Sequence, residues 1–304
     1  MVISKSPVRG WVHVRSVAAN LKILVGFLAI ALLVTACQGR TGDTGAGRTG
    51  SSVPPSDSPT ITAIKKRGVL RAGVAISPPH LMQDPRTSEY FGAGALIAKR
   101  LADKLGVKAE LVESDWGLFV AGLQADKFDL TTAALFATPE RQKVIDFVNF
   151  TRVGQCYIVL KNNAKVNSLD DLNKPTVKIG TLTGSGGDQL IRAKYKQAVI
   201  DDVPGAPGQI ERLQDVLARR IDASFVDSWM APVYAAKFPQ IKIIPDGPEA
   251  CVKNPDVPVD VGIGLRKDDA KFKEFVQGVI SETQNEIDAE ILKYSTEEFL
   301  KIPK

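Results

Sequence analysis

DLTTAALFATPERQKVIDFVNF, residues 129–150, is the most informative stretch of the chain, because it places one arginine at the end of an apolar strand. Residues 130–136 are almost wholly apolar, which predicts a strand buried on both faces, and Pro139 then ends the strand and opens a short helix. Backbone N–H groups are free at such a strand-to-helix junction, so the guanidinium of Arg141 and these groups together suit a carboxylate. We therefore predict that Arg141 binds an anion.

The N-terminal segment has the composition of an export signal. Four basic and no acidic residues up to Lys22 precede an uncharged run of 14 residues, Ile23 to Ala36, which is shorter than the roughly 20 residues of a membrane-spanning helix. The sequence VTAC, residues 34–37, is similar to the bacterial lipobox, in which signal peptidase cleaves before a cysteine that is then acylated. We predict a lipoprotein signal peptide at 1–36 and lipidation of Cys37, with palmitate among the acyl chains; an ordinary cysteine in a signal anchor is the alternative.

Residues 38–59 have too few apolar side chains to fold, so 37–59 are predicted to be a lipidated cysteine and a flexible linker. The folded part then begins near Thr60. Without residues 1–36 the chain has 35 Lys and Arg against 34 Asp and Glu, so its basic character comes from the signal. This balance gives no support for nucleic-acid binding.

The rest of the chain alternates strand-like and helix-like segments, which is typical of an α/β fold with a mainly parallel sheet. The first set is 69–75, 93–105, 108–112, 116–123, 128–136 and 139–144. The second set is 156–160, a Ser168-capped helix, 177–181, 188–194, 209–218 and 223–226, followed by a strand at 259–265 and an amphipathic helix at 269–293. The length suits two packed lobes or one large domain.

Residue counts argue against nucleophilic and metal chemistry. After signal cleavage the single histidine is His80, in a proline-stiffened loop without a nucleophile elbow, so we expect it to be a loop or pocket-lining residue. Zinc sites need several His or Cys, so we predict no catalytic residue, metal ligand or cofactor. Cys156 and Cys251 face an oxidising compartment, where a disulfide is permitted, but the sequence leaves it open.

Two further segments carry candidate ligand contacts. The glycine-rich run 180–187 follows a predicted strand and precedes a helix, so its N–H groups either bind an anion or form a plain tight turn; the Lys-Ser/Thr pair of a P-loop is missing. Asp227 ends the predicted strand 223–226, where α/β sheets bind ligands, although alone it is as well explained as a helix N-cap or a surface charge. Arg141 and Asp227 on opposite walls of a cleft would bind a zwitterion such as an α-amino acid.

At this point the chain resembles the amino-acid-binding proteins of ABC importers, the type II solute-binding proteins of family 3, over nearly all of residues 62–304. The resemblance rests on RGVLRAGV (67–74), WGLFVAGLQADKFDL (116–130), ATPERQKVIDF (137–147), GTLTGSGG (180–187), ARRIDASFVD (218–227) and VGIGLRKDD (261–269). It implies a two-lobed α/β type II periplasmic-binding-protein fold with two hinge strands, near 153–160 and 252–260. Lobe 1 would comprise 60–153 plus 256–304, and lobe 2 would comprise 154–255.

By position, the resemblance assigns the carboxylate contact to Arg141, the ammonium contact to Asp227 and a supporting hydroxyl to Ser185. It implies backbone contacts at Gly186 and Ala134.

Departures from the family pattern bear on specificity. Val74 stands where relatives that bind basic amino acids have an aspartate, so a cationic side chain would lack a partner. The other departures are Ser77 for an aromatic residue, Phe136 for a hydroxyl residue, Leu182 at an often polar site, and Trp116 at a site that is often aromatic or leucine. They predict a mostly apolar pocket for a neutral amino acid, unless Phe136 fills core or the ligand is not an α-amino acid.

We therefore expect an extracytoplasmic, lipid-anchored and monomeric binding protein that delivers its ligand to an ABC permease. The expected partners are the amino acid, the permease and the membrane, and not nucleic acid. An enzyme like the cyclohexadienyl dehydratases, or a ligand-sensing protein, is the alternative on the same fold.

Overall fold

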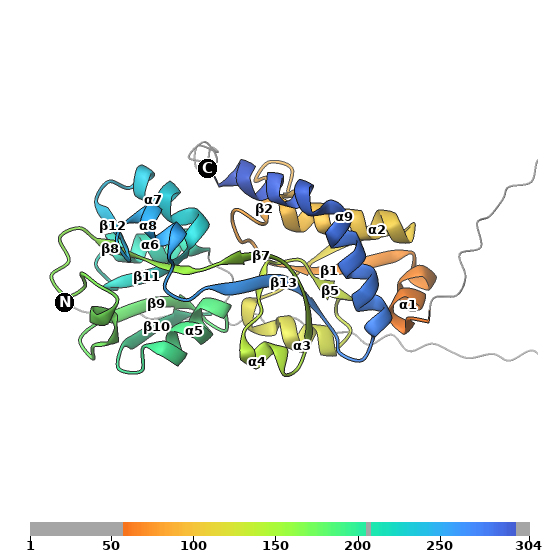
Figure 1. Cartoon of the computed structure of the whole chain (residues 1–304), viewed down its shortest axis with the longest axis horizontal. Coiled ribbons are helices and arrows are strands. Elements are labelled where there is room, and N and C mark those ends of the chain that lie inside the picture. Colours follow the sequence, from red (N-terminus) through yellow and green to blue (C-terminus); the bar gives the residue numbers. More distant parts are fainter. Residues whose placement is uncertain (1–56, 205–207, 296–304) are drawn as a thin grey trace, which may run out of the picture. The chain divides into compact units, whose positions relative to one another are not determined.

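The computed structural model describes residues 57–204 and 208–295, and residues 52–304 group into one unit by their contacts. This unit contains two main sheets, each with helices packed against it (Figure 1). The predicted signal peptide, Cys37 and most of the predicted linker lie outside the described residues. Within those residues, no helix combines the length and the apolar composition of a membrane span.

The first sheet has six strands in the order β4-β1-β5-β13-β6, with β7 also paired to β13. Its strands are β1 Val69–Val74, β4 Lys108–Glu113, β5 Leu130–Thr131, β6 Leu135–Phe136, β7 Asp146–Val153 and β13 Val259–Leu265. β1 is parallel to β4 and β5, whereas β13 is antiparallel to β5, β6 and β7. The N-terminal part and the C-terminal part of the chain therefore share one sheet.

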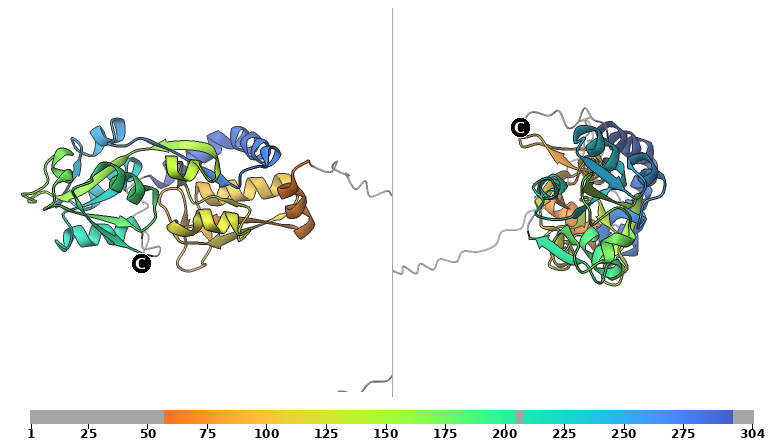
Figure 2. Two further views of the ribbon diagram at one scale, coloured as in Figure 1. Left: turned by 90° about the horizontal axis from the view of Figure 1, so that it is seen from below. Right: turned by 90° about the vertical axis from the view of Figure 1, so that its left-hand side faces the viewer.

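Helices cover this sheet on both faces, and apolar cores fill the space between the sheet and the helices. The helices around it are α1 Pro59–Arg67, α2 Ala93–Leu105, the 3-10 turn η1 Trp116–Leu118, α3 Phe119–Gln124, α4 Pro139–Gln142 and α9 Ala270–Tyr294. Helices α2 and α9 lie side by side and bury a common apolar core against the sheet (Figure 1 and Figure 2). Helix α3 belongs to a separate core around Phe119 and Phe128. The short hairpin of β2 Met82–Gln83 and β3 Tyr90–Phe91 follows β1.

The second sheet has five strands in the order β10-β9-β11-β8-β12. They are β8 Gln155–Leu160, β9 Lys178–Leu182, β10 Val199–Val203, β11 Ala223–Asp227 and β12 Ile241–Ile244. The surrounding helices are η2 Asp170–Asn173, α5 Gly186–Lys194, α6 Gln209–Leu217, η3 Ser228–Met230, α7 Ala231–Lys237 and α8 Pro248–Lys253. All six residues of β8 are buried, and alternate ones enter two different apolar cores, as a central strand covered on both faces requires.

The chain passes between the two sheets twice, at adjacent places. Gly154 alone separates β7 from β8, and residues 254–258 lead from α8 back to β13. The N–H of Asp256 donates to the carbonyl of Gln155 at 2.9 Å, which ties the two crossings together. A Cβ atom on Gly154 would lie 2.1 Å from the ring of Pro255, so only glycine allows the crossings to pack this closely. The two-lobed α/β class expected from the sequence is therefore correct.

The prediction of one continuous strand over 128–136 was wrong. Between the pairs Leu130–Leu265 and Leu135–Gly262, β13 advances three residues while the partner segment advances five. Two residues must therefore loop out of the ladder, and Ala134 takes a positive φ of 52°. The pattern of apolar residues gave no sign of this, because the looped-out residues are buried too.

Smaller differences concern short elements. The helix expected at 139–144 ends at Gln142. Ser168 does not cap η2; the side chain of Asp171 instead accepts hydrogen bonds from the N–H groups of Asn167 and Ser168. The sequence analysis also did not predict α1, β2, β3, β7, β10, β12, α7 and α8.

Cys156 and Cys251, which the sequence left open, form a disulfide between β8 and α8. Their Cα atoms are 6.0 Å apart, and both residues are fully buried in the core between the sheet and α6, α7 and α8. The bond joins positions 95 residues apart, so it encloses almost the whole of the segment that forms the second sheet.

Replacement of both cysteines by alanine should lower the free energy of unfolding by about 2–5 kcal/mol, because the unfolded chain regains the freedom of a long loop. Urea unfolding with and without reductant measures the change. Reductant should destabilise the wild type by a similar amount and leave the double variant unaffected; equal effects of reductant on both proteins would contradict the assignment.

Candidate functional site

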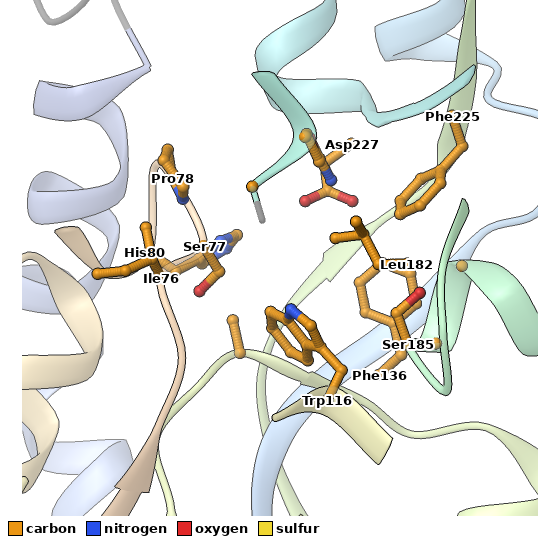
Figure 3. A pocket seen from close by; sticks show the side chains of 15 residues that line it. Ile76, Ser77, Pro78, His80, Trp116, Phe136, Leu182, Ser185, Phe225 and Asp227 are labelled. Carbon is orange, nitrogen blue, oxygen red and sulfur yellow. The ribbon is translucent and has the colours of Figure 1, made fainter. Parts of the chain in front are cut away.

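A cavity lies where loops from the two sheets meet (Figure 3). Its lining residues follow strands or open helices, and all of them lie in loops or at element ends except Phe225, which is within β11. They are Ile76, Ser77, Pro78, His80, Trp116, Ala134, Phe136, Leu182, Ser185, Gly186, Gly187, Gly208, Gln209, Phe225 and Asp227. The cavity volume is about 40 Å³, which has room for a few water molecules.

The structure brings eight of the nine predicted ligand-binding residues to this cavity. Those eight are Ser77, Trp116, Ala134, Phe136, Leu182, Ser185, Gly186 and Asp227. The loop after β1, η1 and the β5–β6 segment supply the first four, while β9, α5 and β11 supply the rest. Arg141 is the ninth and is not one of the lining residues.

Arg141 is hydrogen-bonded to Phe136, a residue that lines the cavity. Its Nη1 donates to the carbonyl of Phe136 at 3.1 Å and its Nη2 to the carbonyl of Gly184 at 3.0 Å. Burial lowers its pKa to about 10, which still leaves the guanidinium charged at neutral pH. Because these two bonds use only some of its N–H groups, the cation keeps the capacity to bind an anion that reaches it.

Arg141 lies where the parts of the site that come from the two sheets are in contact. Gly184 follows β9, with a φ of 71°, and a Cβ atom there would lie 2.6 Å from the Cα of Gly117. On the same side, the hydroxyl of Thr138 donates to Oε1 of Gln189 at 2.7 Å. The guanidinium, the hydroxyl and this close backbone approach join the two sheets along one edge of the cavity.

Asp227 is the single charged side chain among the lining residues. It is 7% exposed, and its Oδ1 has no hydrogen-bond partner. Burial raises the pKa of this carboxyl to about 7, against a smaller lowering by a hydrogen bond with the Gln209 side chain. The carboxyl group makes no capping bond to the following turn and is not on the surface, so both simpler interpretations of Asp227 fail.

Ser185 holds the start of α5. Its Oγ accepts from the N–H of Asp188 at 3.1 Å, which leaves the hydroxyl proton for another acceptor. Asp188 in turn accepts from the Gly184 N–H and the Thr181 hydroxyl. The glycine-rich run is thus a rigid turn with a hydroxyl and backbone N–H groups at the cavity.

His80 lines the cavity, which agrees with the expectation of a pocket-lining residue. It is 2% exposed, and neither ring nitrogen has a hydrogen-bond partner. Burial lowers its pKa to about 4, so the imidazole is neutral at physiological pH.

The sequence reading missed several wall residues. Ile76 and Pro78 flank Ser77, and Gly187 ends the glycine-rich run, so a wider window around each motif would have found them. Phe225 lies two residues before Asp227 and therefore points to the same side of β11. Gly208 and Gln209 open α6 and carried no recognisable signal. Among residues 57–204 and 208–295, no group of three His, Cys, Asp or Glu side chains is placed to hold a metal ion.

Comparison with known proteins identifies the class. Residues 70–295 match the family of bacterial extracellular solute-binding proteins, family 3, and the chain belongs to this family. It is 31% identical over 182 residues to a probable amino-acid ABC transporter periplasmic-binding protein of Sinorhizobium fredii, and the match covers 58% of this chain and 56% of that protein. It is also 26% identical over 222 residues to cyclohexadienyl dehydratase of Pseudomonas aeruginosa, covering 71% of this chain and 78% of the enzyme.

The fold is that of solved amino-acid-binding proteins. The crystal structure of an ancestral amino-acid-binding protein, described as a precursor of cyclohexadienyl dehydratase, matches with a TM-score of 0.66 and 30% identity. The match covers 78% of this chain and 100% of that one. Most relatives found are thus binding proteins, with one enzyme among them.

Asp227→Asn should change how stability depends on pH. The carboxyl has a pKa of about 7 in the folded protein and an ordinary value of 3.8, so between these values the folded protein holds a proton that the unfolded chain releases. Stability of the wild type therefore falls as pH rises through this window. Relative to wild type, the variant should gain up to about 4 kcal/mol between about pH 4 and pH 8.

Urea unfolding at several pH values tests this. His80 acts in the opposite direction, because its lowered pKa costs stability below the ordinary histidine pKa of 6.5. It is present in both proteins, so its effect cancels in the difference. A stability difference that does not vary with pH would disprove the assignment.

Proposed function

We propose that this protein captures a small neutral amino acid with a partly apolar side chain in the cavity between its two lobes and delivers it to a membrane permease of an ABC importer. The proposed lobes are 60–153 with 256–304, and 154–255. The observation that carries the proposal is one buried carboxylate, Asp227, whose Oδ1 has no hydrogen-bond partner, in a cavity whose other lining side chains are uncharged. Family membership and the names of the relatives support the transport role.

In this proposal Asp227 binds the ammonium group of the ligand. A buried carboxylate without a positively charged partner is costly, and an ammonium group offsets that cost through a charge-assisted hydrogen bond. The uncharged walls favour a neutral ligand side chain, because a second charge would find no partner among Ile76, Leu182, Phe136 and Phe225.

The ligand carboxylate is assigned to the opposite end of the cavity. There the Ser185 hydroxyl, the backbone N–H of Gly186 and the N-terminus of α5 provide neutral donors. Arg141 provides the positive charge once the ligand competes with the carbonyls of Phe136 and Gly184 for its N–H groups. Trp116, Ala134 and Ser77 complete the walls.

The predicted lipid anchor completes the proposal. Acylation of Cys37 would hold the protein at the outer face of the cell membrane as a monomer, next to its permease, with the linker before α1 as a tether. Radiolabelled palmitate supplied to cells that express the protein tests the anchor, with Cys37→Ala as the control.

The second candidate function is an enzyme similar to the dehydratase relative. Asp227 favours it, because a carboxyl with a pKa of about 7 is suited to general acid or base catalysis near neutral pH. Turnover assays with prephenate and arogenate separate the two functions: product formation that Asp227→Asn abolishes would establish the enzyme.

Titration of the purified protein with the standard amino acids should give micromolar affinity for a neutral ligand, about −8 kcal/mol. Asp227→Asn should weaken binding roughly 10- to 100-fold through loss of the charge-assisted contact, and Arg141→Gln should weaken it to a similar degree. Calorimetry measures both effects. Asp126→Asn is the matched control, because this carboxylate is 74% exposed and outside the cavity; if no amino acid binds the wild type, the proposal fails.

Binding should also release a proton below neutral pH. The ammonium group requires an ionised Asp227, whereas the carboxyl is mostly protonated at about one pH unit below its pKa of about 7. Affinity should therefore rise with pH up to about 7 and then level off. Calorimetry near pH 6 in two buffers of different ionisation enthalpy should show about one proton released in the wild type and none in Asp227→Asn; a buffer-independent heat in the wild type would contradict the ion pair.

A further inference from the structure

His80 has an unusual environment for a buried histidine. Both ring nitrogens are buried without a hydrogen-bond partner. The residue lines the cavity, and its ring also lies edge-on to Phe150 of the apolar core, with the ring centroids 6.2 Å apart. A buried polar atom that lacks a partner destabilises a fold. A histidine that only filled space would therefore be inferior to an apolar residue here.

The backbone fixes the direction of this side chain. The N–H of His80 donates to the carbonyl of Ser77 at 2.8 Å, and its carbonyl accepts from Gly94 at 2.9 Å. Ser77 is itself bonded to the carbonyls of Ala75 and Ala133. Figure 3 shows the imidazole, the indole of Trp116 and the carboxylate of Asp227 directed toward the same space. The ring therefore faces the ligand from the first lobe, while Asp227 faces it from the second.

A neutral imidazole offers one donor and one acceptor on opposite edges of its ring. A hydroxyl or carboxamide group satisfies either nitrogen, whereas an aliphatic side chain satisfies neither. A cationic side chain is disfavoured because Asp227, the single charge in the lining, is already assigned to the ammonium group, and the uncharged walls do not compensate a second charge.

From this geometry we infer that His80 determines specificity: the ligand is an uncharged amino acid whose side chain carries a hydroxyl or carboxamide group that hydrogen-bonds to the imidazole. The inference rests on the proposed function and narrows it. The apolar walls contact the carbon atoms of such a side chain, and His80 pairs with its polar end.

Isosteric ligand pairs test the inference, because threonine and valine, or asparagine and leucine, differ mainly in hydrogen-bonding capacity. Calorimetry on the full protein should show tighter binding of the polar member, by at least roughly fivefold in one of the two pairs. In His80→Leu, the ratio of the affinities for the two members of the preferred pair should fall to near one. His80→Gln keeps a donor and an acceptor, so it should retain most of the preference for the polar member. The ratio remains informative if a variant folds less well, since partial unfolding weakens both members alike.

Each outcome is decisive. Equal binding of both members of both pairs by the wild type, or a preference that survives His80→Leu, overturns the role of His80 and leaves the proposed function standing. Absence of binding by every amino acid overturns the proposed function and this inference with it.

Discussion

The site depends on one buried carboxylate. Asp227 ends β11, a strand whose five residues are all buried, and the N–H of the next residue, Ser228, donates to the carbonyl of Gly154 at 2.9 Å. Apolar cores on both faces of the second sheet hold β11 in place, so the carboxyl cannot turn to solvent to regain hydration. The desolvation that raises its pKa is therefore imposed by the fold, and a complementary positive group is what the site lacks.

The same hydrogen bond places the carboxylate at the point where the chain crosses between sheets. Asp256, on the returning segment, accepts from the hydroxyls of Tyr157 and Tyr195 at 3.0 and 2.7 Å and from Lys194. The crossings are thus anchored to the second lobe by an acid with three donors. Any change in the angle between the lobes would have to occur in the few residues on the other side of these anchors, near Gly154 and before β13, because the anchored residues move with the second lobe.

Sequence predicted the parts of the site that depend on local pattern. The apolar run before Asp227 predicted that this residue lies at a strand end, and the glycine-rich run predicted the turn that carries Ser185. The loop at Thr132–Ala134 was not predictable, because it arises from a register difference against β13, a strand more than 120 residues away. The hydrogen bonds of Arg141 could not be predicted either, because both of its acceptors are backbone carbonyls, which carry no sequence signature.

The position of Arg141 connects ligand binding to the contact between the lobes. Its two acceptors belong to different lobes, Phe136 to the first and Gly184 to the second, so the guanidinium already bridges them. A ligand carboxylate that bound this cation would add a third acceptor, or replace one, near the close approach of Gly184 to Gly117. In the proposed function, the free energy of binding at Arg141 would therefore favour the arrangement in which the two lobes are in contact.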